Sequence, residues 1–110
     1  MTELTKIKCA PCEGGIPALT QAEAEDHGKD TPEWKMSGDF KKISREFTFG
    51  NFYETMAFVN AVAWIANQQD HHPDIEVSYS KAVVRYWTHA IDGLSVNDFI
   101  CAARIDQIAD

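Results

Sequence analysis

The sequence predicts a single α+β domain, in which three helices pack on one face of a four-stranded antiparallel sheet in the order α-β-β-α-β-β-α. The chain has 110 residues, which is enough for one domain with its own core and too few for two. The spacing of apolar residues changes from helical to alternating and back twice along the chain. Each helical stretch also begins with a capping residue followed three positions later by an acidic one.

The three helices are predicted from these capping signals and from apolar spacing. The first is expected over residues 19–26, with a threonine N-cap, and the sequence HGKDTPE then ends it. The second is expected over residues 52–69, after Asn51. The third follows Ser95, with Asp98 completing the capping signal.

The middle helix has a wide apolar stripe and a less apolar opposite side. Residues expected on the buried side are Phe52, Met56, Phe58, Val59, Val62, Ala63, Ile65 and Ala66. Trp64 projects to the other side, with Tyr53, Asn60 and Asn67. A tryptophan there is either an additional core contact or a contact between subunits, and the sequence leaves both interpretations open.

Two hairpins supply the four strands. Residues 34–49 predict the first, with its turn at Gly38 and Asp39, and the second arm alternates apolar and polar side chains. Residues 74–89 predict the second, with a turn near Ser80 and Lys81 and a second strand that ends at His89. In its first strand Ile75, Val77 and Tyr79 are expected on one side.

Residues 1–17 are expected to form an N-terminal arm, and residues 18–110 the folded domain. The arm holds Cys9 and Cys12 in a C-x-x-C spacing. A zinc ribbon needs a second such pair and a thioredoxin-like site follows a strand, so reduced thiols are the default, while a disulfide or an intersubunit metal stays open. With Cys101 the chain has three cysteines, which give no disulfide framework and suit a reducing compartment.

The charge and the N-terminus narrow the function classes. A formal net charge of -7 repels phosphate backbones, so nucleic-acid binding is not expected, whereas a protein partner stays open. The sequence has no run of 18 or more apolar residues and no secretory signal pattern at its N-terminus. We therefore expect a cytoplasmic protein that does not bind membranes.

Three of the four histidines form the candidate site. His72 precedes Pro73, which pushes its backbone into an extended conformation, so the middle helix should end around Asp70 or His71. A tight second hairpin brings the start of its first strand opposite the end of its second strand. This places His89 beside His71 and His72. Imidazoles with a pKa near 6.5 exchange protons at neutral pH.

The alternatives to an acid–base site are structural or metal-binding histidines. The remaining histidine, His27, is expected to be solvated. Three imidazoles could bind zinc, but the chain has neither an H-x-x-x-H spacing nor a cysteine pair near His71, so the sequence favours acid–base chemistry without a metal.

The stretch DHHPDIEVSYSKAVVRYWTHAIDGLSVNDF resembles the central motif of the pterin-4a-carbinolamine dehydratases. In that family an H-H-P triplet is followed by a strand pair ending in T-H and then by G-L-[ST]-x-x-D. The similarity extends through FTFGNFYETMAFVNAVAWIANQ and FICAARID and covers about residues 32–106. The C-x-x-C arm and FVNAVAWI look more like the bacterial members, which are associated with phenylalanine hydroxylase.

The resemblance implies a reaction. Aromatic amino acid hydroxylases leave their tetrahydropterin as a 4a-hydroxy adduct, and the dehydratase removes water from this carbinolamine to give the quinonoid dihydropterin. The reaction needs an acid and a base but no metal or separate cofactor, since the substrate is itself a form of a pterin cofactor. The implied partners are the pterin, further copies of the chain in a dimer or tetramer, and phenylalanine hydroxylase.

Carried over residue by residue, the resemblance makes His71, His72 and His89 the catalytic histidines. His72 or His89 would exchange a proton with the 4a-hydroxyl, and His71 would bind the pterin or handle the complementary proton. Asp98 matches the acidic residue of the family, and it either orients a ring or only caps the last helix. Asp70 and Pro73 are expected in supporting or substrate-binding positions.

Two positions depart from the animal enzymes, which have Glu and Trp where this chain has Asn67 and Ile75. These changes should alter affinity more than reaction type. Animal members also act as dimerisation cofactors of a homeodomain transcription factor, so a protein-binding or coactivator role is the competing function. It would use the helix face of Tyr53, Asn60 and Trp64 and would not need the histidines.

Overall fold

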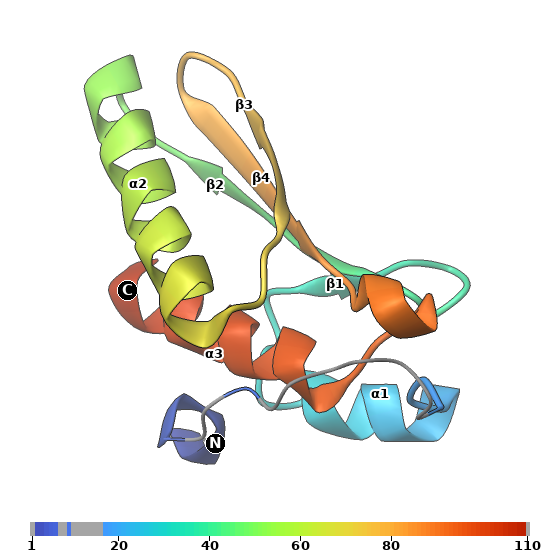
Figure 1. The fold of residues 1–110 in the computed structure, drawn as a ribbon. Helices are drawn as coiled ribbons and strands as arrows, with labels where there is room; N and C mark the ends of the chain where they lie inside the picture. Colours follow the sequence, from blue (N-terminus) through green and yellow to red (C-terminus); the bar gives the residue numbers. More distant parts are fainter. Residues whose placement is uncertain (1, 7–8, 10–16, 110) are drawn as a thin grey trace.

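In the computed structural model, residues 2–6, 9 and 17–109 are described. The order of helices and strands is α1 (Gln21–Gly28), β1 (Lys35–Met36), β2 (Ile43–Thr48), α2 (Phe52–Gln69), β3 (Asp74–Val77), β4 (Lys81–Tyr86) and α3 (Val96–Ala109) (Figure 1). Two short 3-10 helices are also present, η1 (Thr2–Lys6) before α1 and η2 (His89–Ile91) between β4 and α3. The predicted fold class and element order are confirmed.

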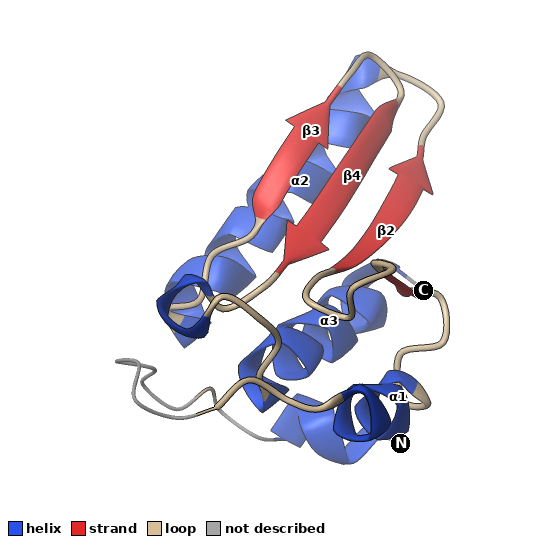
Figure 2. Cartoon of the chain, turned by 90° about the vertical axis from the view of Figure 1, so that its right-hand side faces the viewer, coloured by secondary structure: helices blue, strands red, loops and turns tan. Residues whose placement is uncertain are grey.

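The four strands form one antiparallel sheet in the order β1-β2-β4-β3. α2 runs behind β3 and β4 when the open face of the sheet is viewed, and α3 and α1 lie toward the lower end of the strands (Figure 2). β4 pairs with β2 through Ile43 opposite Tyr86, and with β3 through Asp74 opposite Arg85. The chain leaves β2, crosses behind the sheet as α2 and returns as β3, so the end of α2 and the end of β4 meet at one end of the sheet.

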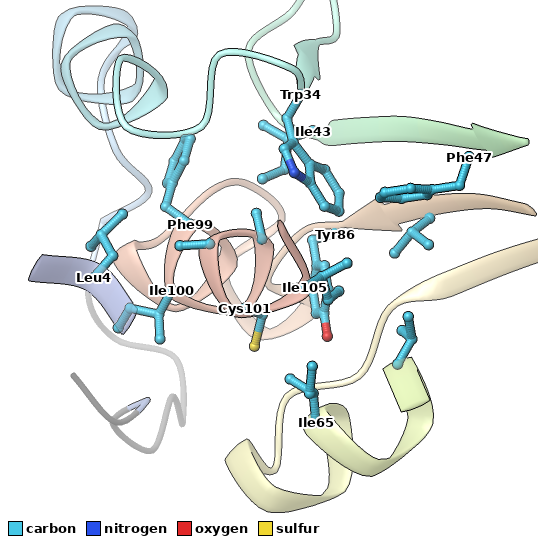
Figure 3. Packing of buried hydrophobic residues seen from close by; sticks show 14 of the residues in the cluster. Leu4, Trp34, Ile43, Phe47, Ile65, Tyr86, Phe99, Ile100, Cys101 and Ile105 are labelled. Atoms are coloured by element: carbon cyan, nitrogen blue, oxygen red, sulfur yellow. The ribbon is translucent and has the colours of Figure 1, made fainter. Parts of the chain in front are cut away.

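The core fills the space between the sheet and the helices (Figure 3). Its largest fully buried side chains include Tyr86, Phe99, Ile43, Leu94, Ile100 and Ile105. Leu4 in η1 is 4% exposed and belongs to the same cluster, so the described part of the N-terminal segment contributes to the core. The division of the chain at residue 17 stays a prediction.

The capping predictions for the first two helices are confirmed by hydrogen bonds. Thr20 and Glu23 form a reciprocal capping box at α1, and the side chain of Asn51 accepts from the backbone N–H of Glu54 at α2. α2 ends at Gln69, and Asp70 adopts the left-handed conformation with φ 51°. α1 runs to Gly28, two residues beyond the predicted end, because the HGKD sequence continues the last turn through backbone bonds.

The buried face of α2 differs from the predicted stripe. Its buried residues are Thr55, Phe58, Val62, Ile65, Ala66 and Gln69, whereas Phe52 and Ala63 are exposed. Polar Thr55 can be buried because its hydroxyl lies within hydrogen-bond distance of the carbonyls of Asn51 and Tyr79. Phe52 lies outward, where its ring stacks on that of Tyr79 at 6.4 Å between centroids, and an apolar surface is left on α2.

The second hairpin is shorter than predicted. β4 ends at Tyr86, and His89 lies in η2 instead of a strand. The reason is a tight turn: Thr88 pairs with Gly93, and Asp92 takes a left-handed conformation, so the chain reverses before α3. Val77 and Tyr79, expected on the same side as Ile75, are 41% and 65% exposed, because Val77 is the last residue of the edge strand β3 and Tyr79 lies in the turn beyond it.

Candidate active site

The site is built where α2 ends and β3 begins. Asp70 terminates the helix, and the backbone N–H of His71 still donates to the carbonyl of Ala66. Pro73 then favours an extended backbone at His72, and β3 starts at the next residue. The predicted positions of Asp70, His71 and His72 at a helix end and strand entry are confirmed.

His71 is held rigidly on the inner side of this turn. Its ring lies 5.4 Å from that of Tyr86 with an interplanar angle of 11°, and the Tyr86 hydroxyl donates to the carbonyl of His71 over 3.2 Å. The Nε2 atom of His71 lies 2.6 Å from Oδ1 of Asp98, and these side chains are 11% and 0% exposed. Asp98 thereby occupies the Nε2 atom of His71, and Nδ1 is the second nitrogen of the ring.

Asp98 performs both of the roles that the sequence left open. Its Oδ1 atom faces His71, while Oδ2 accepts from the backbone N–H of Ser95 and from the hydroxyl of Thr88, each over 2.9 Å. The hydroxyls of Thr88 and Ser95 lie 2.7 Å apart. One buried carboxylate therefore caps α3, fixes the chain after β4, and orients the imidazole of His71.

The environment of His71 favours its protonated ring. Burial by itself lowers the pKa of His71, but the hydrogen bond and negative charge of Asp98 outweigh it. Cys9 and Asp70 add smaller contributions in the same direction, and the pKa is raised above its ordinary value. Near neutral pH the ring therefore carries a proton more readily than a histidine in water.

His72 and His89 lie on the more exposed side of the same end of the sheet. The Nε2 atom of His72 lies 3.1 Å from Oδ1 of Asn67, which stands where the animal enzymes have glutamate. His89 packs against Trp87 at 4.3 Å between ring centroids. In the part of the chain that the structure describes, no hydrogen bond or ring contact joins His89 to His71 or His72.

The sequence prediction missed Tyr86 and Thr88 as partners of the site. The alternation along β4 puts Tyr86 on the inner face, but only the pairing with β2 and the packing of α3 place it against His71.

The prediction that His27 is solvated was wrong. Its side chain is half-buried and stacks on Phe99 at 5.4 Å between ring centroids.

The candidate metal ligands do not gather into a metal centre in the part of the chain that the structure describes. Residues 2–6, 9 and 17–109 hold no group of three or more His, Cys, Asp or Glu side chains that could bind a metal ion. Cys12 lies outside the described residues, so the state of the C-x-x-C pair stays open.

None of the described helices is long and apolar enough to span a membrane.

A four-stranded antiparallel sheet with three helices, and a histidine–aspartate pair where α2 and α3 meet, places the chain among small α+β proteins. Residues 17–108 match the family model described as "Pterin 4 alpha carbinolamine dehydratase". The chain belongs to this family.

Similar proteins agree with this assignment. A protein of Nitrosomonas eutropha named "Putative pterin-4-alpha-carbinolamine dehydratase" is 53% identical over 107 residues, which cover 96% of this chain and 93% of that protein. A protein of the same name from Legionella pneumophila (strain Paris) is 47% identical over 108 residues, covering 97% of this chain and 96% of that protein.

Two solved structures share the fold. A transcriptional coactivator/pterin dehydratase from Brucella melitensis matches with a TM-score of 0.79 and 27% identity, covering 84% of this chain and 99% of that one. A pterin dehydratase-like protein identified as a RuBisCO assembly factor in the alpha-carboxysome matches with a TM-score of 0.61 and 23% identity, covering 70% and 89%. The second match supports the fold alone.

Proposed function

We propose that this chain dehydrates a 4a-hydroxytetrahydropterin to the quinonoid dihydropterin and water, with His71, His72 and His89 as its acid–base groups. The observation that carries the proposal is the His71–Asp98 pair, 2.6 Å long and closed to solvent on the aspartate side, in a chain of the carbinolamine dehydratase family. Buried pairs of titratable groups with shifted pKa values are common at catalytic sites.

The reaction requires two proton movements. The 4a-hydroxyl must receive a proton so that the C–O bond breaks and water leaves, and a ring nitrogen of the pterin must lose a proton as the new double bond forms. His72 and His89 reach the surface and can exchange protons with a bound substrate and with solvent. We assign the exchange with the 4a-hydroxyl to one of these two residues.

His71 is proposed to bind the pterin or to handle the complementary proton. Asp98 occupies its Nε2 atom, so Nδ1 is the nitrogen that would face the substrate. Stacking on Tyr86 fixes the plane of the ring, which reduces the conformational freedom lost when the substrate binds. Asp98 itself is a positioning residue, because it is fully buried and acts through His71.

The proposed reaction needs no metal and no cofactor other than the pterin substrate. It would serve tetrahydropterin recycling for an aromatic amino acid hydroxylase, with phenylalanine hydroxylase as the expected enzyme. Asp70 and Pro73 would shape the turn that carries the two adjacent histidines. The cytoplasmic location expected from the sequence stays a prediction.

The proposal is tested by stopped-flow ultraviolet spectroscopy of freshly generated 4a-hydroxytetrahydropterin. We expect the native chain to accelerate dehydration over the spontaneous reaction, and His72→Ala or His89→Ala to lose about 10²-fold or more of that acceleration. His27→Gln is the matched control, because the His27 ring stacks on Phe99 and not at the turn that carries His71 and His72. The dehydration rate of this variant should equal that of the native chain. The absence of acceleration by folded native protein would overturn the proposal.

A protein-binding role is the second candidate, favoured by the apolar surface on α2. Tyr53 and Trp64 are 90% and 65% exposed, and a groove of about 460 Å³ is lined by Phe52, Tyr53, Met56, Ala57 and Asn60. Exposed apolar patches of this kind mark interaction sites. The structural relative from Brucella melitensis is described as a coactivator as well as a dehydratase.

The same face is the expected contact of a homo-oligomer, so the two uses of α2 must be separated. Light scattering with size-exclusion chromatography gives the number of subunits for the native chain and for Tyr53→Ser with Trp64→Ser. A dimer or tetramer that dissociates in the double variant assigns the face to self-association. A monomeric native chain would contradict the oligomer prediction. The exposed face of α2 would then be assigned to binding of another protein.

A further inference from the structure

Two thiols that the proposed reaction does not use lie next to each other behind His71. The Sγ atoms of Cys9 and Cys101 are 3.6 Å apart, although the residues are separated by 92 positions in the sequence. Both are free cysteines; Cys9 is half-buried and Cys101 is buried in α3 (Figure 3). Among the described residues, Cys9 is therefore the more accessible of the two sulfurs to an oxidant from solvent.

Cys9 is tied to both helices that form the site. Its backbone N–H donates to the side-chain oxygen of Gln69, the last residue of α2, over 2.9 Å. Its Sγ atom lies 3.6 Å from the carbonyl of Asn97 in the first turn of α3. These contacts hold the Cys9 sulfur against Cys101, whose own Sγ lies 4.0 Å from the carbonyl of His71.

The two thiols are chemically unequal. A hydrogen bond from Cys101 lowers the pKa of Cys9 and outweighs the effect of burial, and the positive charges of His71 and Arg104 act in the same direction. The same hydrogen bond, together with burial, raises the pKa of Cys101. The thiolate is the nucleophile in thiol oxidation, so Cys9 is the attacking sulfur and Cys101 the resolving one.

We propose that Cys9 and Cys101 form a peroxide-reactive dithiol that closes to an intramolecular disulfide beside the His71–Asp98 pair. The oxidant is hydrogen peroxide. The Cys9 thiolate attacks one peroxide oxygen, the O–O bond breaks, and the departing hydroxide takes a proton to become water. Cys101 then loses its proton and attacks the sulfenic sulfur of Cys9; the S–S bond forms and the S–O bond breaks with release of a second water.

This step oxidises two thiols and reduces one peroxide to two waters, so it needs no further reactant. The sulfurs must approach by about 1.5 Å to reach the disulfide distance of about 2.05 Å. The bond would link the N-terminal segment to α3, one turn after Asp98. Oxidation would therefore fix the position of Cys9 against the same helix that holds the partner of His71.

The test uses the full-length protein, fully reduced and then freed of reductant. It is treated with a few equivalents of hydrogen peroxide, blocked with iodoacetamide, and digested with trypsin without reduction. We expect mass spectrometry to find residues 9–29 joined to residues 86–104, with the loss of two hydrogen atoms. The link should persist in Cys12→Ser and disappear in Cys9→Ser.

Each other outcome overturns the proposal. A disulfide within residues 9–29 would mean that Cys9 pairs with Cys12. A link to residues 86–104 that survives in Cys9→Ser would make Cys12 the partner of Cys101. Cys9 that stays reduced, or that oxidises without forming a link, would make the two thiols a packing contact only. Circular dichroism of Cys9→Ser checks that this variant, changed at a half-buried position, is folded.

Discussion

Replacing Asp98 with asparagine isolates the charge of the site from its shape. The amide has almost the size of the carboxylate, and its oxygen can still accept from Ser95 and Thr88. Its NH2 group would then face Nε2 of His71, which can accept that bond only when the nitrogen is unprotonated. We expect the pKa of His71 to fall from its raised value, since burial is then opposed by only the smaller charge effects of Cys9 and Asp70.

The loss of stability can be worked out from the bonds of the carboxylate. It accepts three hydrogen bonds, from His71, Thr88 and Ser95. A bond to a charged group contributes about 1.5–3 kcal/mol and a neutral one about 0.5–1.5, so each bond weakens by about 1 kcal/mol and the three by about 3 kcal/mol. In a domain of this size about 1 kcal/mol lowers the Tm by about 4 °C, which predicts a decrease of about 12 °C near pH 6.

Two measurements check this prediction. Thermal unfolding gives the Tm, and a nuclear magnetic resonance titration of the histidine ring protons gives the pKa of His71. Asp70→Asn is a graded control, because Asp70 contributes least to the shift and should lower the pKa of His71 by less. If the native chain and the Asp98→Asn variant gave the same pKa for His71, the argument that Asp98 sets the protonation of this ring would be refuted.

Two further predictions follow from the same structure. The raised pKa of His71 contributes stability that is complete below about pH 6.5 and is lost as the pH rises through the folded-state pKa. In urea unfolding at several pH values, the difference in unfolding free energy between the native chain and Asp98→Asn should therefore shrink toward alkaline pH. A difference that stays constant with pH would contradict this linkage. Asp106→Ala should cost about 2–4 kcal/mol, because the carboxylate accepts from both Trp34 and Arg45, which become unsatisfied. Lys41→Ala, which removes the exposed pair with Asp92 and keeps the left-handed residue of the turn, should cost about 0–1 kcal/mol by the same urea measurement, and equal losses would contradict the ranking.

The sequence determined the features that depend on neighbouring residues. Asn51 and Glu54 start α2 through a bond between residues three apart, and the constraint of Pro73 on His72 ends it, so the helix was predicted at its observed bounds of Phe52 and Gln69. The alternation in β2 and the capping box at Thr20 are local in the same sense. Together these signals were sufficient for the fold class and the element order.

The outward rotation of α2 and the early end of β4 were not predictable in this way. Phe52 is as apolar as Phe58, but Phe58 packs against the rings of Phe47 and Phe49 whereas Phe52 stays 48% exposed. Residues after Tyr86 keep a β-rich composition, but the hydrogen bonds of Thr88 with Gly93 and Asp98 turn the chain into η2. In both cases contacts between distant elements override the local preference.

The candidates for the chemistry could be read from the amino-acid sequence, because the motif around His71, His72 and His89 is contiguous and the hairpin brings its ends to one end of the sheet. The partners of each candidate residue depend on contacts between elements far apart in the chain. His71 meets Asp98 across 27 residues, and Cys9 meets Cys101 across 92. Periodicity and capping act over a few residues, whereas such contacts depend on how helices pack against the sheet, and that packing is set by the whole core.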